Sequence, residues 1–280
     1  MIATDRVGNF DHDKLIRMMV GRTIEDFYPK QEASIGEVVL EARDLSLANR
    51  FHNISFQLRA GEILGIAGLV GAGRSELVEC IFGLSRPTSG ELYIRGERVN
   101  FRHPQDAIRS RMALITEDRK LTGLNLRASV EQNITLVALP RLSRMGIINP
   151  EREAQAAETY IHELSIRTFS RKTPVANLSG GNQQKVVLAK WLLTEPDIII
   201  LDEPTRGIDV GAKRDIYLLM GALAARGKAV LMVSSELPEI MGLADRVIVL
   251  AAGNLTGELR RHEFSQEAIM RYASAFRQNG

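Results

Sequence analysis

The sequence predicts an α/β fold with a mainly parallel sheet, a small antiparallel β-subdomain and a helical insertion. Three observations lead to this prediction. Apolar runs of strand length alternate with amphipathic stretches of helix length from Val38 to Leu250. Near the front of this region, polar and apolar residues alternate over short segments, which is typical of half-exposed antiparallel strands. Between about Leu121 and Leu178 the pattern becomes helical.

The parallel strands are predicted from continuous apolar runs, because a strand that is covered on both faces shows no alternation. They are expected at Glu62–Ala67, Ala113–Thr116, Asp197–Leu201, Ala229–Ser234 and Val247–Leu250. The antiparallel strands are expected where alternation is clear, at Ile54, Phe56 and Leu58 and again at Leu92 and Ile94.

The helices are predicted from apolar residues at helical spacing and from capping residues. They are expected at Ser75–Phe82, Ser129–Leu139, Pro150–Leu164, Gln184–Leu193 and Ser265–Phe276. The chain then divides into a linker or docking arm (1–36), a main domain (37–264, with a helical subdomain at about 121–178) and a C-terminal helix and tail (265–280). A frayed terminus is the alternative for the first part.

The composition excludes several classes of protein. Of the 280 residues, 45% are apolar, which is enough for a buried core and excludes overall disorder. The net charge is +2, and no stripe of Lys and Arg indicates nucleic acid. Cys80 is the single cysteine, so a scaffold held by intrachain disulfides is excluded and a reducing cytosol fits best. With neither a secretory signal nor a run of roughly 18 apolar residues, any membrane connection is expected to go through a partner.

A glycine-rich segment between an expected strand and helix predicts a phosphate-binding loop. Its backbone N–H groups and the helix N-terminus can surround an anion. The residues expected to contact the nucleotide are Gly68, Gly71, Ala72, Gly73, Arg74, Ser75 and Glu76. Ser75 is also expected to ligate Mg²⁺, whereas Arg74 stands where the usual motif has Lys, and the two are not interchangeable. The alternative is a plain glycine-rich turn.

Two acids follow the apolar strand Asp197–Leu201, at the edge of the sheet where α/β proteins bind ligands. Asp202 can hold Mg²⁺ beside Ser75, and Glu203 can polarise a water for attack on a γ-phosphate. A solvated turn is the alternative for these two acids, and their combination with a phosphate loop argues against it.

The segment Leu178-Ser-Gly-Gly-Asn-Gln183 precedes an expected helix. A helix N-cap would explain the serine but not the two glycines. Here the sequence resembles the ATP-binding cassette family, whose signature Leu-Ser-Gly-Gly-Gln it matches except at Asn182. The phosphate loop, helical insertion, signature and acid pair occur in that family's order between Val38 and about Leu259.

More closely, the segments Gly68–Arg74, Glu117–Lys120, Leu178–Lys185 and Asp202–Gly207 resemble the second cassette of the tandem ATPases of bacterial ribose, galactose and arabinose importers. Met18–Arg22 resembles their linker. The resemblance implies ATP and Mg²⁺ as cofactors, a head-to-tail partner cassette that is the first half of the tandem, membrane permease subunits and, indirectly, a periplasmic sugar-binding protein. It implies no nucleic acid, and a peripheral place on the cytoplasmic side of the inner membrane.

In the same family, Ser179, Gly180 and Gly181 would contact the ATP of the opposite cassette. Glu117 and Ser235 stand where active cassettes carry a glutamine and a switch histidine. These departures leave two functions open: an ATP-hydrolysing subunit that drives carbohydrate import, with Glu203, Glu117 and Ser235 as its catalytic positions, or a catalytically weak half that completes its partner's site. A soluble cassette acting in translation or DNA repair would be expected to carry coiled coils or a zinc hook, which the sequence lacks.

The residue that stacks on adenine is not evident from the sequence. Phe51 is a candidate, with a place in the core of the β-subdomain as the alternative.

Overall fold

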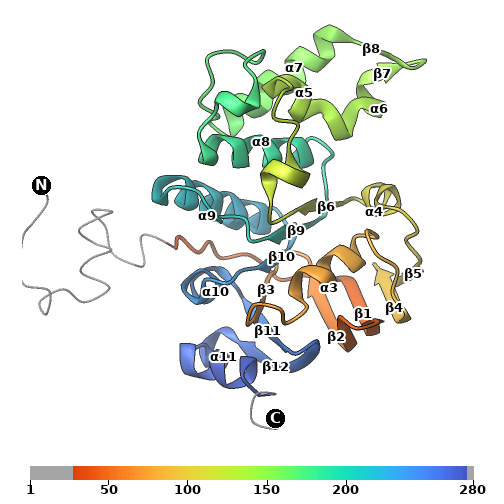
Figure 1. The fold of residues 1–280 in the computed structure, drawn as a ribbon, viewed down its shortest axis with the longest axis vertical. Coiled ribbons are helices and arrows are strands. Elements are labelled where there is room, and N and C mark those ends of the chain that lie inside the picture. Colours follow the sequence, from red (N-terminus) through yellow and green to blue (C-terminus); the bar gives the residue numbers. More distant parts are fainter. Residues whose placement is uncertain (1–27, 276–280) are drawn as a thin grey trace, which may run out of the picture.

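A six-stranded sheet forms the centre of the computed structural model, which describes residues 28–275 (Figure 1). In spatial order its strands are β12 (Asn254–Arg260), β11 (Arg246–Ala251), β3 (Ile63–Gly68), β10 (Ala229–Val233), β9 (Ile198–Asp202) and β6 (Met112–Ile115). All neighbours are parallel except β12, which is antiparallel to β11. The predicted α/β class and its five parallel strands are confirmed, and β12 is an addition that the sequence analysis did not include.

A second, antiparallel sheet has the order β2 (Phe51–Arg59), β1 (Val38–Leu47), β4 (Ser89–Ile94) and β5 (Glu97–Val99). Its inward side chains, together with α3 (Arg74–Ile81) and one face of the central sheet, form a single apolar core. This confirms the predicted antiparallel β-subdomain. Because α3 is packed into that core, the phosphate loop in front of it has a rigid base.

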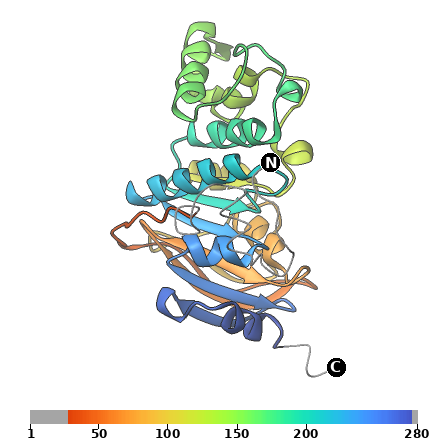
Figure 2. The ribbon, with the colours of Figure 1, turned by 90° about the vertical axis from the view of Figure 1, so that its left-hand side faces the viewer.

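The opposite face of the central sheet is covered by helices (Figures 1 and 2). They are α8 (Gly180–Leu192), α9 (Val210–Ala225), α10 (Leu237–Leu243) and α11 (Gln266–Ala273). At one end of the molecule's long axis, α5 (Val130–Thr135) and α7 (Pro150–Glu163) pack on α8 around a small core of their own. α4 (Pro104–Arg109) and the π-helical turn η2 (Arg119–Gly123) flank β6.

Three predicted helix bounds are wrong. The helix expected at Ser129–Leu139 ends at Thr135 and continues as a 3-10 turn, η3 (Leu136–Ala138), and then α6 (Leu139–Leu142). Pro140 lacks the N–H that would continue the α-helical pattern, which accounts for the break. The helix expected from Gln184 begins at Gly180, and the C-terminal helix ends at Ala273.

The helical insertion also contains a β-hairpin that the sequence analysis did not predict, β7 (Ser143–Arg144) and β8 (Ile147–Ile148). Its two-residue turn, Met145-Gly146, has positive φ at both positions, 53° and 79°. Such a turn matches the twist of two antiparallel strands.

The described part of the expected arm, residues 28–36, lies against the main domain. The Tyr28 ring packs on Tyr217 with a centroid distance of 5.3 Å, and Lys30 pairs with Asp245 at 2.7 Å. Gly36 donates its N–H to the Ala60 carbonyl at 2.8 Å. The amphipathic piece from Lys14 to Val20 lies outside the described residues. Across residues 28–275, no helix is long and apolar enough to cross a bilayer.

Candidate functional site

The glycine-rich loop joins β3 to α3. Gly68 has φ 155°, and a Cβ there would lie 2.4 Å from the Leu250 carbonyl oxygen, so a side chain does not fit. Gly73 is the N-cap of α3 with φ 92° and provides no side chain to cap the helix. The first-turn N–H groups are therefore available to an anion. The Ala72 N–H is already bonded to the Leu69 carbonyl at 3.0 Å, and Glu76 pairs with Arg50 at 3.2 Å.

Two hairpin turns support this loop through backbone contacts. The Gly253 N–H donates to the Ala72 carbonyl at 3.2 Å, and the His52 N–H donates to the Gly253 carbonyl at 2.7 Å. A Cβ on Gly73 or Gly253 would lie 3.0 or 2.5 Å from the Arg50 carbonyl oxygen. The loop is thus held between the β1–β2 and β11–β12 turns at a spacing that side chains would not allow.

Arg74 is buried and reaches from the loop to the ends of two strands. Its Nη1 donates to the Ser234 carbonyl, just after β10, at 2.8 Å. Its Nη2 lies 3.6 Å from the Glu203 carboxylate, just after β9. The arginine at the lysine position therefore connects the phosphate loop with the acid pair, which the shorter reach of a lysine ammonium would not do in the same way.

Asp202 ends β9 and is 3% exposed. Burial raises the pKa of its carboxyl to about 6, against the opposing effect of a hydrogen bond from Ser75. Its Oδ1 has no hydrogen-bond partner among the described residues. A carboxylate oxygen without a partner beside a hydroxyl is the type of oxygen donor set that Mg²⁺ binds, so the two residues predicted to hold the metal fit it.

Glu203 and Ser235 lie side by side after β9 and β10. Ser235 Oγ donates to the Glu203 carboxylate at 3.1 Å, and Glu203 has an uncommon φ of 47°. A positive φ at a residue other than glycine is a strained conformation of the kind that occurs at functional sites. The structure thus brings Arg74, Ser75, Asp202, Glu203 and Ser235 together at the carboxyl edge of the sheet.

Glu117 makes different contacts. It follows β6 and forms an ion pair with Arg206. Both residues line a groove of about 420 Å³ together with Asp118, Arg119, Lys120 and Gly207. Glu117 is thus engaged at the loop after β9 and not with Asp202 or Glu203.

Ser179, Gly180 and Gly181 begin α8, with Ser179 as the exposed N-cap. Asn182 donates its Nδ2–H to Ser179 Oγ at 2.9 Å, so the residue that departs from the expected signature holds the serine hydroxyl. Both glycines are closely packed, and Gly181 more tightly, because its neighbour is a Cβ atom and not the movable end of an arginine side chain. A Cβ on Gly181 would lie 2.4 Å from the Ala212 Cβ, and one on Gly180 would lie 2.8 Å from an Arg119 nitrogen.

The comparisons with known proteins agree with this geometry. A family model described as ABC transporter matches residues 51–206, which is more than half of the chain. The chain belongs to the ABC transporter family. It is 47% identical to a ribose import ATP-binding protein RbsA of Clostridium tetani (97% of this chain, 54% of that protein) and 45% identical to the Bacillus subtilis protein of the same name (99% and 56%). The cassette spans about half the length of these relatives.

Solved structures show the same fold at low sequence identity. An ATP-binding cassette of an ABC transporter in its ADP conformation aligns with a TM-score of 0.69 at 19% identity, over 86% of this chain and 96% of that one. A dimeric post-hydrolysis cassette bound to ADP and Pi aligns with a TM-score of 0.68 at 22% identity, over 80% and 100%. Both support the P-loop architecture of this ABC cassette.

Phe51 is fully buried in the core of the ABC cassette. Its ring is therefore part of the β-subdomain core, and the adenine-stacking alternative is wrong.

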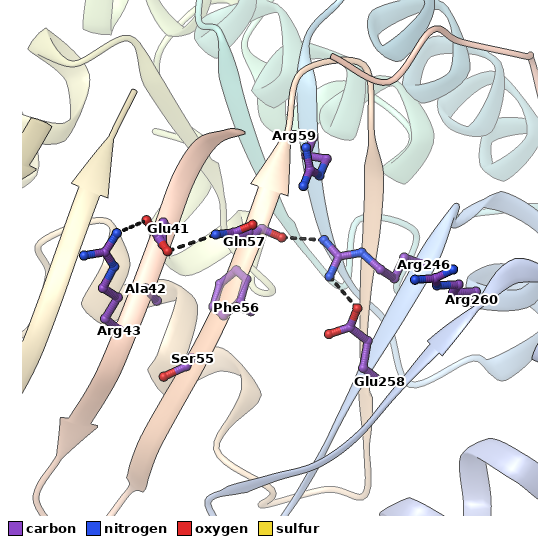
Figure 3. Close-up of a pocket in the computed structure, with 10 residues that line it drawn as sticks. All are labelled: Glu41, Ala42, Arg43, Ser55, Phe56, Gln57, Arg59, Arg246, Glu258 and Arg260. Carbon is purple, nitrogen blue, oxygen red and sulfur yellow. Dashed lines mark hydrogen bonds and ion pairs between the residues drawn. The ribbon is translucent and has the colours of Figure 1, made fainter. Parts of the chain in front are cut away.

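A groove of about 470 Å³ lies between the antiparallel sheet and the β11–β12 edge (Figure 3). Arg246 crosses it, donating to the Gln57 carbonyl at 2.5 Å and to Glu258 at 2.9 Å, and it also pairs with Glu62. Arg246 begins β11, whereas the phosphate loop follows the other end of β3. In the ABC cassette this groove is therefore a place where charged side chains connect the two sheets. It lies away from the predicted nucleotide-binding site.

Sequence reasoning missed several residues around these sites. Arg119 donates to the carbonyls of Arg206 and Gly207 at 2.8 and 3.1 Å beside Gly180. Asp209 caps α9 by accepting from the Ala212 N–H at 2.9 Å, and it lines a groove with Ser179 and Gly181. An Asp before a helical stretch is an N-cap signal that could have indicated Asp209. No local sequence pattern indicates the contacts of Arg119, because its partners lie 87 and 88 residues away.

Proposed function

We propose that this cassette binds Mg-ATP on residues 68–76 and hydrolyses it to drive carbohydrate import through a membrane permease. The observation that carries the proposal is the convergence of Arg74, Asp202, Glu203 and Ser235 beneath the phosphate loop. The names of the ribose import relatives support sugar as the substrate class. These relatives are about twice as long as this chain, which supports the proposal that the chain is the second cassette of a tandem protein.

In this proposal, the loop N–H groups and Arg74 bind the phosphates, and Ser75 and Asp202 hold Mg²⁺. A Mg²⁺ ion held by these two residues would neutralise part of the negative charge of the phosphates. Glu203 accepts a proton from a water whose oxygen attacks the γ-phosphorus, and the bond to the bridging oxygen breaks, leaving ADP and phosphate. Ser235 orients the Glu203 carboxylate through its hydroxyl. Glu117 forms its ion pair with Arg206 in the loop after β9, so its proposed contribution to catalysis is through that loop.

Two exposed surfaces support the proposed partners. Ser179 at the N-terminus of α8 is exposed and can contact the γ-phosphate held by a head-to-tail partner cassette. The dimeric cassette among the structural neighbours supports this assembly. In this proposal the segment 117–126 and the helical subdomain contact the permease, and the exposure of Leu121 (82%) supports a contact there. The cassette would then lie peripherally on the cytoplasmic side of the inner membrane. A periplasmic sugar-binding protein delivers the substrate.

The second candidate is a catalytically weak half that binds ATP and completes its partner's site. Two features favour it. Arg74 is already engaged with Ser234 and Glu203, and Ser235 offers a hydroxyl where an imidazole would be expected. A hydroxyl at pH 7 neither carries a positive charge nor accepts a proton readily, so the site would turn over slowly.

Equilibrium binding of Mg-ATP to the chain tests the shared part of both candidates, and the absence of binding by the folded chain would contradict both. The two are separated by steady-state ATPase of the tandem protein assembled with its permease. If the partner's site is the active one, Ser179→Ala or Gly181→Asp costs on the order of 10²–10³ in rate, and Glu203→Gln costs little. The reverse order would show that this cassette's own site hydrolyses ATP.

A further inference from the structure

Glu239 of α10 is a buried carboxylate, 1% exposed, that lies outside every motif discussed above. Three hydroxyls donate to it: Thr205 Oγ1 at 2.6 Å and Tyr217 OH at 2.5 Å to Oε1, and Ser234 Oγ at 2.8 Å to Oε2. Lys213 Nζ lies 3.3 Å from Oε1. A buried charge is costly unless it is paired and hydrogen-bonded, and these four donors meet that requirement.

The donors come from separate parts of the chain. Thr205 is in the loop after β9, two residues beyond Glu203. Ser234 is in the loop after β10, directly before Ser235, and its carbonyl accepts the hydrogen bond from Arg74. One carboxylate therefore binds both loops that carry the residues around the proposed γ-phosphate position.

Two further hydrogen bonds connect these loops to their surroundings. The Glu203 N–H donates to the Val233 carbonyl at 3.0 Å, and the Glu236 N–H donates to Ser234 Oγ at 3.0 Å. A shift of Ser234 would therefore move the Arg74 acceptor, and it would move Ser235 away from Glu203. Both changes would occur without any loss of a group that touches nucleotide.

We propose that Glu239 is a positioning residue for ATP hydrolysis: it holds the loops after β9 and β10 together so that Glu203, Ser235 and Arg74 keep their mutual geometry. The proposal rests on the proposed function for its effect on turnover. Its effect on the two loops does not depend on ATP.

The test compares Glu239→Gln with Glu131→Gln. Glu131 is a matched control because it is 2% exposed and buried in the helical subdomain, where it pairs with Arg171 and Lys172. Amide hydrogen exchange of the chain without nucleotide is followed at Glu203, Arg206 and Glu236. Glu239→Gln is expected to raise exchange there at least tenfold, whereas Glu131→Gln leaves it unchanged.

ATP turnover is then measured with a first cassette present. Glu239→Gln is expected to lower kcat at least tenfold and to change KM by less than threefold, because the loop N–H groups and the Arg74 guanidinium are all still present to bind the phosphates. Glu131→Gln is expected to leave kcat within twofold even if it lowers Tm as much. Thr205→Val, which removes one donor, is expected to produce the same pattern more weakly, and it decides the matter if Glu239→Gln does not fold.

The proposal is overturned if the exchange at these amides is unchanged, or if both glutamine variants lose kcat in proportion to their loss of Tm. A wild-type protein that neither binds nor hydrolyses ATP would contradict the proposed function. In that case the exchange measurement still shows whether Glu239 holds the two loops.

Discussion

Arg74 Nη2 and the Glu203 carboxylate lie 3.6 Å apart, with only 9% and 10% of their side chains exposed. The phosphate-loop arginine and the proposed proton acceptor are thus an ion pair that is largely shielded from water. The attraction between opposite charges is stronger there than at the surface. A change in either residue therefore alters the surroundings of the other.

Arg74→Ala should weaken Mg-ATP binding by on the order of tenfold to a hundredfold, because a hydrogen bond to a charged group contributes about 1.5–3 kcal/mol. Arg74→Lys should weaken it less, since an ammonium still provides the positive charge. The measurement is equilibrium titration of a fluorescent ATP analogue. Arg109→Ala is the control, because Arg109 is exposed and pairs only locally with Asp106. Equal affinity of the wild-type and Arg74→Ala proteins would contradict the prediction.

Gly181→Ala should lower the free energy of unfolding by about 1–3 kcal/mol through overpacking, because the new Cβ would lie 2.4 Å from the Ala212 Cβ. Ala212→Gly removes that contact, so the double variant should lose less stability than the sum of the two single variants. Urea unfolding of the four proteins measures this difference. Strict additivity would show that the two positions are not in contact.

Gly242→Ala should destabilise the protein, because its Cβ would lie 2.5 Å from the Tyr28 ring. In a Tyr28→Ala background the same substitution should stabilise it by about 0.5–1 kcal/mol, the usual gain of alanine over glycine within a helix. The sign of the change in Tm is the measurement. The same sign in both backgrounds would contradict the packing of Tyr28 on α10.

Lys190 should make stability depend on pH. Burial lowers the pKa of its ammonium from 10.5 to about 8. Its Nζ donates to the Gly123 carbonyl at 2.5 Å. Between these two pKa values the unfolded chain binds more protons than the folded one, so the free energy of unfolding should rise as pH increases above 8. About 3 kcal/mol is the upper limit for a shift of this size.

The prediction for Lys190 is checked by denaturant unfolding between pH 8 and 9.5. Burial raises the pKa of Cys80, Tyr28 and Tyr217, so these groups lose protons first in the unfolded chain and partly oppose the rise. Lys190→Met should lack the lysine's contribution to the slope. A slope that is unchanged in Lys190→Met would assign the pH dependence to other groups.

The parallel strands could be predicted because strands covered on both faces are continuous apolar runs. β12 could not, because among its residues only Leu259 is buried and the others are polar or partly exposed. Likewise, the chemistry of the phosphate loop and of Asp202 can be read from local sequence. The contacts of Arg119 with Gly207 and of Glu239 with Thr205 join segments 88 and 34 residues apart, and no local pattern indicates them.

The close approach of Gly73 and Gly253 to the Arg50 carbonyl limits which substitutions these two positions can accept. Gly253 lies outside the phosphate loop, yet a methyl group there, as on Gly73, would push against the β1–β2 turn at the Arg50 carbonyl. In a saturation library selected for ATP binding, position 253 should therefore be as restricted as the phosphate loop itself. The exposed apex residue Val70, by contrast, should accept many side chains.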